Sequence, residues 1–208
     1  MKFESGSYYH FYNRGGNSSE VFFSYDDFDF FLSKFKYYLS LSTETYAYCI
    51  LKNHFHFLIK VLDENEIQFK SRCISESDYV SYYALPNSDN RSFPVHKLIS
   101  HWLNSYSRYF NKKYHRTGPV WDGRINRRTV DTVEYLQKVI CYIHRNPIHH
   151  GITSNYTDYK FSSYSEILDK TSIHISPDIV FKEFGGFENF IVAHQEYKGD
   201  YGENDFQL

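Results

Sequence analysis

The stretch that most constrains the fold is NHFHFLIKVL, residues 53–62, in which histidines and apolar residues alternate. Side chains in a β-strand point alternately to the two faces of a sheet. His54 and His56 therefore share one face, whereas Phe55 and Phe57 point to the other face and predict a hydrophobic core there. Two imidazoles placed in this way can ligate one divalent ion, although the same pattern also arises from two surface histidines with nothing bound.

The chain on both sides of this stretch predicts further strands and helices. A strand precedes it and is joined to it by a tight turn at residues 52–53. Farther upstream, apolar residues recur every three or four positions behind Asp26 or Asp27, either of which can cap a helix. Downstream, residues 131–134 resemble a capping box, and Pro147 should end the helix that follows. The expected strands are Tyr8–Asn13, Thr45–Leu51, His54–Leu62 and Arg124–Val130, and the expected helices lie near 26–39, 96–111, 131–146, 177–184 and 188–194.

This order of elements predicts an α+β fold of the ferredoxin or RRM-like split βαβ type. Its antiparallel sheet would carry helices on one face and leave the other face open for a ligand. A length of 208 residues suits a single domain, which we place at residues 1–197. A polar insertion is expected at about 63–94, and the polar residues 198–208 are expected to form a mobile tail.

The composition excludes several classes of protein. Aromatic residues make up 20% of the chain, which argues against disorder, and three cysteines do not form a disulfide framework. No apolar run approaches the length of a membrane span, and no export signal is visible at the start, so we expect a cytoplasmic protein without a membrane partner. The aromatic excess is consistent either with an AT-rich codon bias or with a surface that stacks on bases.

Basic residues gather in one segment although the net charge of the whole chain is −2. Residues 105–128 hold seven cations and one acid, interleaved with aromatic side chains. Neutralisation of phosphates combined with base stacking is typical of binding to single-stranded nucleic acid, although a charged, solvated helix end would have the same composition. The expected DNA-binding residues are Arg108, Lys112, Lys113, Arg116, Arg124, Arg127 and Arg128, extended by Asn13 and Arg14 at the end of the first strand.

The helix expected at residues 131–146 carries a second polar pair. Tyr142 and Asn146 are four residues apart and thus neighbours on the helix surface, beside its apolar stripe. A phenol is a possible nucleophile and an amide oxygen is a possible metal ligand. The plainer interpretation is a half-buried aromatic residue and a polar residue near the helix end.

Taken together, these segments resemble the single-tyrosine HUH transposases, the insertion-sequence-200-like group, and especially its REP-associated relatives. The resemblance runs in order through nearly the whole chain. Two departures are Lys52, where relatives often have proline, and the long stretch 63–94. The segments that carry the resemblance are YHFYNRGGNSSEVFF, AYCILKNHFHFLI, SRYFNKKYHRTGPVWDGR, YIHRNPIHHGI and FGGFENFIVAH.

The resemblance implies a role for each matching residue. Tyr142 corresponds to the catalytic tyrosine, and His54, His56 and Asn146 correspond to the ligands of Mg²⁺ or Mn²⁺. The implied reaction is cleavage and rejoining of single-stranded DNA beside a hairpin or palindromic repeat, with a 5′-phosphotyrosine and a free 3′-OH as products of the first step.

The resemblance also implies a setting, and it leaves alternatives open. A bacterial cytoplasmic enzyme, at the nucleoid when it acts, is expected as a monomer or a homodimer. The alternatives are a domesticated module that binds single-stranded or hairpin nucleic acid without cutting it, and a metal-dependent hydrolase with no covalent step.

Overall fold

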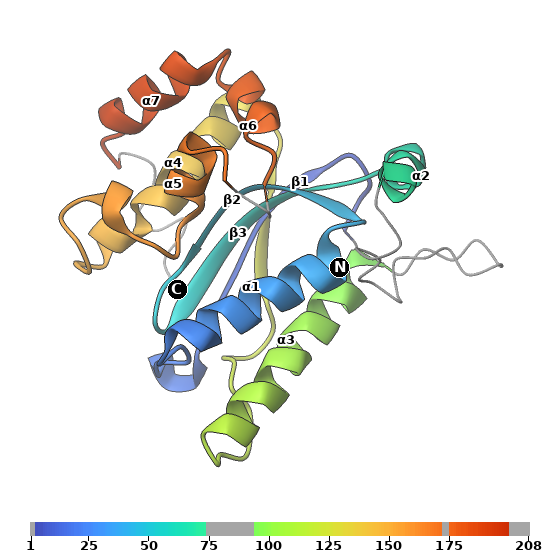
Figure 1. The fold of residues 1–208 in the computed structure, drawn as a ribbon, viewed down its shortest axis with the longest axis vertical. Coiled ribbons are helices and arrows are strands. Elements are labelled where there is room, and N and C mark those ends of the chain that lie inside the picture. Colours follow the sequence, from blue (N-terminus) through green and yellow to red (C-terminus); the bar gives the residue numbers. More distant parts are fainter. Residues whose placement is uncertain (1–2, 74–93, 172–174, 200–208) are drawn as a thin grey trace.

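The structure is a computed structural model that describes residues 3–73, 94–171 and 175–199 (Figure 1). The insertion expected at 63–94 begins with a helix, α2 (Glu64–Cys73). Residues 74–93 of that insertion and residues 200–208 of the expected tail lie outside the described residues. The single domain 1–197 and the mobile tail therefore stay predictions. None of the helices in the described parts of the chain is long and apolar enough to cross a lipid bilayer.

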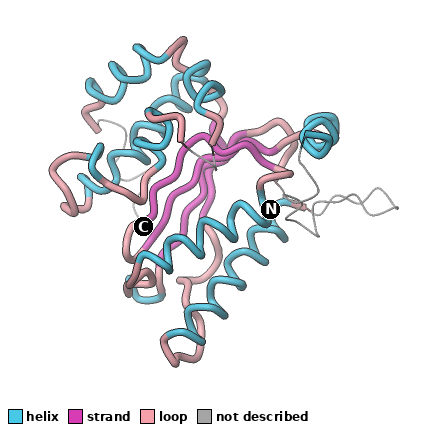
Figure 2. Tube along the Cα trace, in the orientation of Figure 1, coloured by secondary structure: helices cyan, strands magenta, loops and turns pink. Residues whose placement is uncertain are grey.

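Four antiparallel strands form one sheet in the order β2-β3-β1-β4. The sheet is drawn in magenta in Figure 2. Strands β3 and β1 form the centre, and β2 and β4 form the edges. The α+β class and the antiparallel sheet predicted from the sequence are confirmed. The strands are β1 (Tyr8–Arg14), β2 (Thr43–Ile50), β3 (His54–Val61) and β4 (Asn126–Val130).

The register between β1 and β3 decides which side chains share a face. Tyr12 pairs with His56 and Arg14 pairs with His54. Paired residues of an antiparallel ladder lie on the same face, and the alternation places His10 there as well. We call this side of the sheet the histidine face and the opposite side the core face.

Two helices cover the core face, α1 (Tyr25–Leu39) and α3 (Val95–Lys113). Trp102 of α3 is fully buried, and its ring centroid lies 4.3 Å from that of Phe31 and 5.3 Å from that of Phe55. The indole Nε1 donates a hydrogen bond to the carbonyl of Phe31 at 2.9 Å, so its one polar group is satisfied. The alternation in the central strand thus predicted the position of the core.

Helix α1 begins earlier than the sequence suggested. Ser24, which has extended backbone angles, is the N-cap, and Asp27 closes a capping box from the third helical position. The Asp27 carboxylate accepts hydrogen bonds from the backbone amides of Phe23 and Ser24 at 2.8 and 2.9 Å. The prediction of Asp26 or Asp27 as the cap was wrong because Ser24 is the N-cap and Asp27 binds the backbone amides from inside the first turn.

The helices do not all lie on one face of the sheet. Helix α4 (Val133–His149) crosses the histidine face, where it packs against β2 and β3. Its N-cap is Thr132, whose side chain accepts a hydrogen bond from the amide of Tyr135 at 3.1 Å. The expectation of an open face is corrected here, because the apolar stripe of α4 needs a surface to cover. That buried stripe consists of Leu136, Val139, Ile140 and Ile143.

Pro147 does not end α4, contrary to the prediction. It lies within the last turn, which runs on to His149. A proline in a helix removes one hydrogen bond to the fourth residue before it. The turn is still closed, because the amide of His150 donates to the carbonyl of Asn146 at 3.1 Å and the amide of Ile152 to that of Pro147 at 2.9 Å.

Three short helices pack near α4 at the C-terminal end of the described chain (Figure 1). The segment just before the first of them lies along the outer edge of β2, where Cys49 forms a bridge with Ser162 and the amide of Ile50 donates to the carbonyl of Phe161. The second and third were predicted, and the first was not. They are α5 (Ser163–Leu168), α6 (Pro177–Glu183) and α7 (Phe187–Glu196).

Candidate active site on the histidine face

The two histidines of β3 point toward α4, and His54 has a partner on both ring nitrogens whereas His56 has a partner on one. His54 Nδ1 lies 2.7 Å from Asn53 Oδ1, and its Nε2 lies 3.1 Å from Asn146 Oδ1. His56 Nδ1 lies 3.0 Å from Nε2 of His10, whereas the buried Nε2 of His56 has no hydrogen-bond partner. The strand and the helix therefore bring His54, His56 and Asn146 together, as the sequence predicted.

Tyr142 completes this cluster from one turn earlier on α4. Its ring centroid lies 5.6 Å from that of His56 and 6.1 Å from that of His10, with the ring edge-on to both. Tyr142 is half-buried, and its burial raises the pKa of the phenol to about 12, although the side chain of Asn146 opposes part of that shift. The phenol is therefore protonated at neutral pH and has to lose its proton to act as a nucleophile.

The imidazoles of the cluster are neutral at physiological pH. Burial lowers the pKa of His10 to about 3, with a further contribution from the charge of Arg128. Burial also lowers the pKa of His54 to about 4 and that of His56 well below its usual value. Neutral imidazoles are the form in which histidine ligates metals.

The donor atoms fit a divalent ion. Both ring nitrogens of His54 face amide oxygens, but a neutral imidazole has one N–H to donate. If that N–H goes to Asn53, the lone pair on Nε2 faces the oxygen of Asn146, and a cation between them would turn this repulsion into attraction. The free Nε2 of His56 supplies a third lone pair. No group of three or more His, Cys, Asp or Glu side chains in the described residues could hold a metal ion, so such a site depends on Asn146.

Among the expected DNA-binding residues, two arginines lie on the histidine face. Arg14 pairs with His54 and Arg128 pairs with His10 across the sheet. The guanidinium of Arg14 donates to Asp122 at 2.9 Å and keeps a side chain that is 35% exposed. Both cations thus lie on β1 and β4, beside the part of the histidine face where α4 packs against β2 and β3.

Asn13 does not belong to this surface. It pairs with Phe55 and so points to the core face, where it is only 1% exposed, and its Oδ1 accepts a hydrogen bond from the amide of Arg14. The prediction that Asn13 contacts DNA is corrected for a simple reason. Neighbouring residues of a strand point to opposite faces, so Asn13 and Arg14 cannot both lie on the same one.

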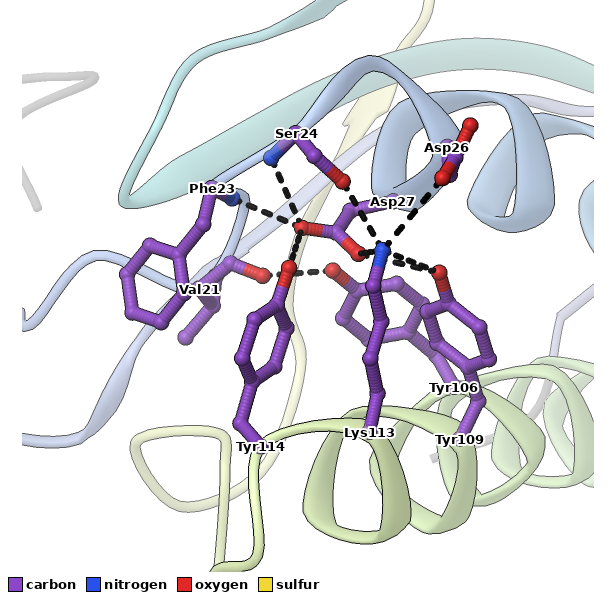
Figure 3. A network of polar contacts seen from close by, with 9 residues as sticks. All are labelled: Val21, Phe23, Ser24, Asp26, Asp27, Tyr106, Tyr109, Lys113 and Tyr114. Atoms are coloured by element: carbon purple, nitrogen blue, oxygen red, sulfur yellow. Dashed lines mark hydrogen bonds and ion pairs between the residues drawn. The ribbon is translucent and has the colours of Figure 1, made fainter.

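Lys113 does not belong to the expected DNA-binding surface either. Its ammonium lies 2.7 Å from the carboxylate of Asp27, which is 0% exposed, and donates to the hydroxyl of Tyr109 (Figure 3). Burial by itself raises the pKa of Asp27, but hydrogen bonds from Lys113, Tyr114 and two backbone amides outweigh it and hold that pKa at about 2. Lys113 therefore joins the end of α3 to the start of α1.

The remaining predicted cations occupy different places. Arg127 points to the face opposite Arg128, with its guanidinium 4.4 Å from the ring centroid of Phe3. Arg108 and Lys112 are exposed on α3, which covers the core face, and the guanidinium of Arg116 lies 5.3 Å from the ring centroid of Phe110. Arg124 is exposed in the loop before β4. The basic segment is thus divided between the two sides of the sheet.

Three histidines near the cluster were not singled out from the sequence. His10 was missed although it has the same period-two relation to Tyr12 and Arg14 that made the histidine pair visible. His150 lies beside His54 at a ring separation of 4.4 Å, and His149 lies 5.7 Å from Tyr142. The last two reach the site because α4 continues past its proline, whereas the sequence predicted that the helix ends there.

Comparison with known proteins identifies a shared fold. No protein-family profile and no curated protein sequence match the chain. The solved structure of a REP-associated tyrosine transposase bound to a REP hairpin matches with a TM-score of 0.54 and 16% identity, over 82% of this chain and 84% of that chain. The two proteins have the same fold.

A second solved structure is less similar. It is a bacterial tRNA(His) guanylyltransferase-like protein in complex with ATP, which matches with a TM-score of 0.39 and 10% identity over 84% of this chain and 74% of that chain. At this TM-score the likeness carries no argument about the present chain.

Proposed function

We propose that the protein is a DNA transposase of the single-tyrosine HUH type, which cuts and rejoins single-stranded DNA beside a hairpin. The observation that carries this proposal is the convergence of Tyr142, His54, His56 and Asn146 on one face of the sheet. These residues come from a strand and a helix that are far apart in the chain. His54 and Asn146, for example, are hydrogen-bond partners although 92 positions separate them. The shared fold with a hairpin-bound transposase supports it.

The proposed metal site consists of Nε2 of His54, Nε2 of His56 and Oδ1 of Asn146. Mn²⁺ suits imidazole ligands, and Mg²⁺ is the harder alternative. When bound, such an ion supplies Lewis-acid polarisation of the scissile phosphate. The protein supplies the burial and the fixed orientation of the three donor atoms.

In the proposed reaction the Tyr142 oxygen attacks the phosphorus of a DNA phosphodiester. The phenol of Tyr142 releases its proton and its oxygen forms a bond to phosphorus, while the bond from phosphorus to the 3′-oxygen breaks and the 3′-oxygen takes up a proton, so the step has no net gain or loss of protons. Because the covalent link preserves the energy of the phosphodiester, a 3′-OH from another strand can reverse the step without a nucleotide cofactor. Arg14 and Arg128 would neutralise phosphates of the strand that lies along the histidine face.

The test is a search for a covalent adduct with DNA. The protein is incubated with labelled single-stranded DNA that carries a hairpin, in the presence of Mn²⁺, and is then denatured in SDS. Wild type should form an adduct that Tyr142→Phe does not form. Tyr12→Phe is the matched control, because Tyr12 also lies on the histidine face, 5.3 Å from the ring of His56, and should leave the adduct intact.

Each alternative gives a different result in the same assay. Binding of the hairpin without an adduct and without cleavage would indicate a non-cutting module. Cleavage that persists in Tyr142→Phe would indicate a hydrolase without a covalent step. Either result would refute the proposed chemistry.

A further inference from the structure

The contact between His10 and His56 is the least explained feature of the site. His10 lies on β1, is 0% exposed, and stacks on His56 with ring centroids 5.1 Å apart and planes inclined by 24°. Its Nε2 lies 3.0 Å from Nδ1 of His56. A buried pair of imidazoles at this distance shares one proton between the two facing nitrogens.

The position of that proton decides what His56 can do. A neutral imidazole carries its proton on one nitrogen and a lone pair on the other. If Nδ1 of His56 donates to His10, the buried Nε2 of His56 keeps a lone pair that can ligate a metal. If His10 donates instead, the proton of His56 lies on Nε2 and blocks that nitrogen as a ligand.

The two ring nitrogens of His54 also have different roles, and its outer partner is Asn53. Its Nδ1 faces Oδ1 of Asn53 at 2.7 Å, and an amide oxygen only accepts hydrogen bonds. Nε2 of His54 therefore keeps its lone pair, which can ligate an ion. A metal-ligating histidine commonly donates its other N–H to such an outer partner, which fixes the tautomer and the orientation of the ring.

We propose that His10 is a positioning residue that accepts the Nδ1 proton of His56 and so keeps Nε2 of His56 free to ligate a metal. This inference rests on the metal site of the proposed function and extends it to a residue on a different strand. In this role His10 acts through His56 and is not itself a ligand.

The first experiment reads the tautomer without metal or DNA. Long-range ¹H–¹⁵N NMR spectra of the imidazoles in the metal-free protein distinguish a protonated Nδ1 from a protonated Nε2. Wild type should show His56 protonated on Nδ1, and His10→Phe should shift His56 toward the other tautomer. A wild-type His56 protonated on Nε2 would overturn the inference whether or not the protein binds a metal.

The second experiment measures Mn²⁺ affinity by the electron paramagnetic resonance signal of the free ion. Loss of the outer partner of a ligand typically weakens metal binding by about 10- to 100-fold, which is the expected effect of His10→Phe. His10→Gln offers an acceptor oxygen of similar reach and should bind more tightly than His10→Asn, whose side chain is shorter. His194→Gln is the matched control, because it alters a buried histidine that does not contact His56 and should leave the affinity unchanged.

The outcomes separate the inference from the proposed function. Mn²⁺ binding by wild type that does not depend on His56, or no binding at all, would refute the metal site and the inference with it. Binding that requires His56 but is equal in wild type, His10→Gln and His10→Asn would overturn the role of His10 alone. That comparison uses two amides, so it remains informative if His10→Phe does not fold.

Discussion

Acid should unfold this protein in a pH range set by its buried histidines, and His194 allows the contribution of one of them to be measured. Nδ1 of His194 lies 2.7 Å from the carbonyl oxygen of Phe190, so it must carry the proton. Nε2 of His194 therefore accepts from Nδ1 of His144 at 2.8 Å, and Nε2 of His144 accepts from the hydroxyl of Ser163 at 2.8 Å. The partners in this chain of hydrogen bonds are all uncharged, so an additional proton would place a positive charge on a ring that is 0% exposed.

The magnitude follows from the shifted pKa. Burial lowers the pKa of His194 from 6.5 to about 4. Between these two values the unfolded chain binds more protons than the folded protein, so stability is complete above pH 6.5 and is lost as the pH falls toward 4. Single-site linkage gives a loss of about 2 kcal/mol at pH 5 and about 3 kcal/mol at pH 4 from this one group.

The assay is urea unfolding followed by tryptophan fluorescence at pH 7.5 and pH 5.0. Wild type should lose about 2 kcal/mol more free energy of unfolding between these pH values than His194→Gln, which has no titrating ring. The buried histidines that do not contact His194, namely His10, His54 and His56, titrate in both proteins, so their contributions cancel in this difference. His96→Gln is the control, because His96 is exposed on α3 and its replacement should leave the wild-type loss unchanged. Equal losses in wild type and His194→Gln would refute the reasoning.

Three further predictions concern single residues. Asp27→Asn should lower the free energy of unfolding by roughly 2 to 3 kcal/mol in urea titrations, because it removes the buried charge that pairs with Lys113 and leaves that ammonium only the exposed carboxylate of Asp26, 3.7 Å away. Arg128→Ala should weaken binding to single-stranded DNA and reduce the slope of log K against log salt by about 1, whereas Arg108→Ala, on the other side of the sheet, should change both less. Trp102→Ala should cost about 3 to 5 kcal/mol in the same unfolding assay, because the fully buried indole fills the space between α1 and the sheet.

Local patterns predicted much of the fold. The alternation in β3 identified the faces of the sheet, because period two is imposed by the backbone of a strand. The helical spacing of apolar residues located α1, α3 and α4, and the same spacing placed Tyr142 and Asn146 next to each other. Tyr142 and Asn146 lie beside His54 and His56 because α4 packs on the histidine face of the sheet.

Contacts between distant residues were not visible in the sequence. Lys113 looked like part of a basic surface because its partner, Asp27, is 86 positions away. The chain from Ser163 through His144 to His194 depends on how three helices pack, and no local pattern encodes that. Asn13 is the exception, because strand alternation alone could have shown that it and Arg14 face opposite sides.

The two edges of the sheet are protected in different ways. An unpaired edge strand is a template onto which another chain can add a strand. At β2 the backbone is already engaged by the segment around Ser162, through the bridge to Cys49 and the hydrogen bond from Ile50 to Phe161. At β4 the strand is only five residues long and contains two adjacent arginines, so charge repulsion opposes the approach of a second copy. Arg128, which faces the proposed DNA path, thus also opposes aggregation through this edge of the sheet.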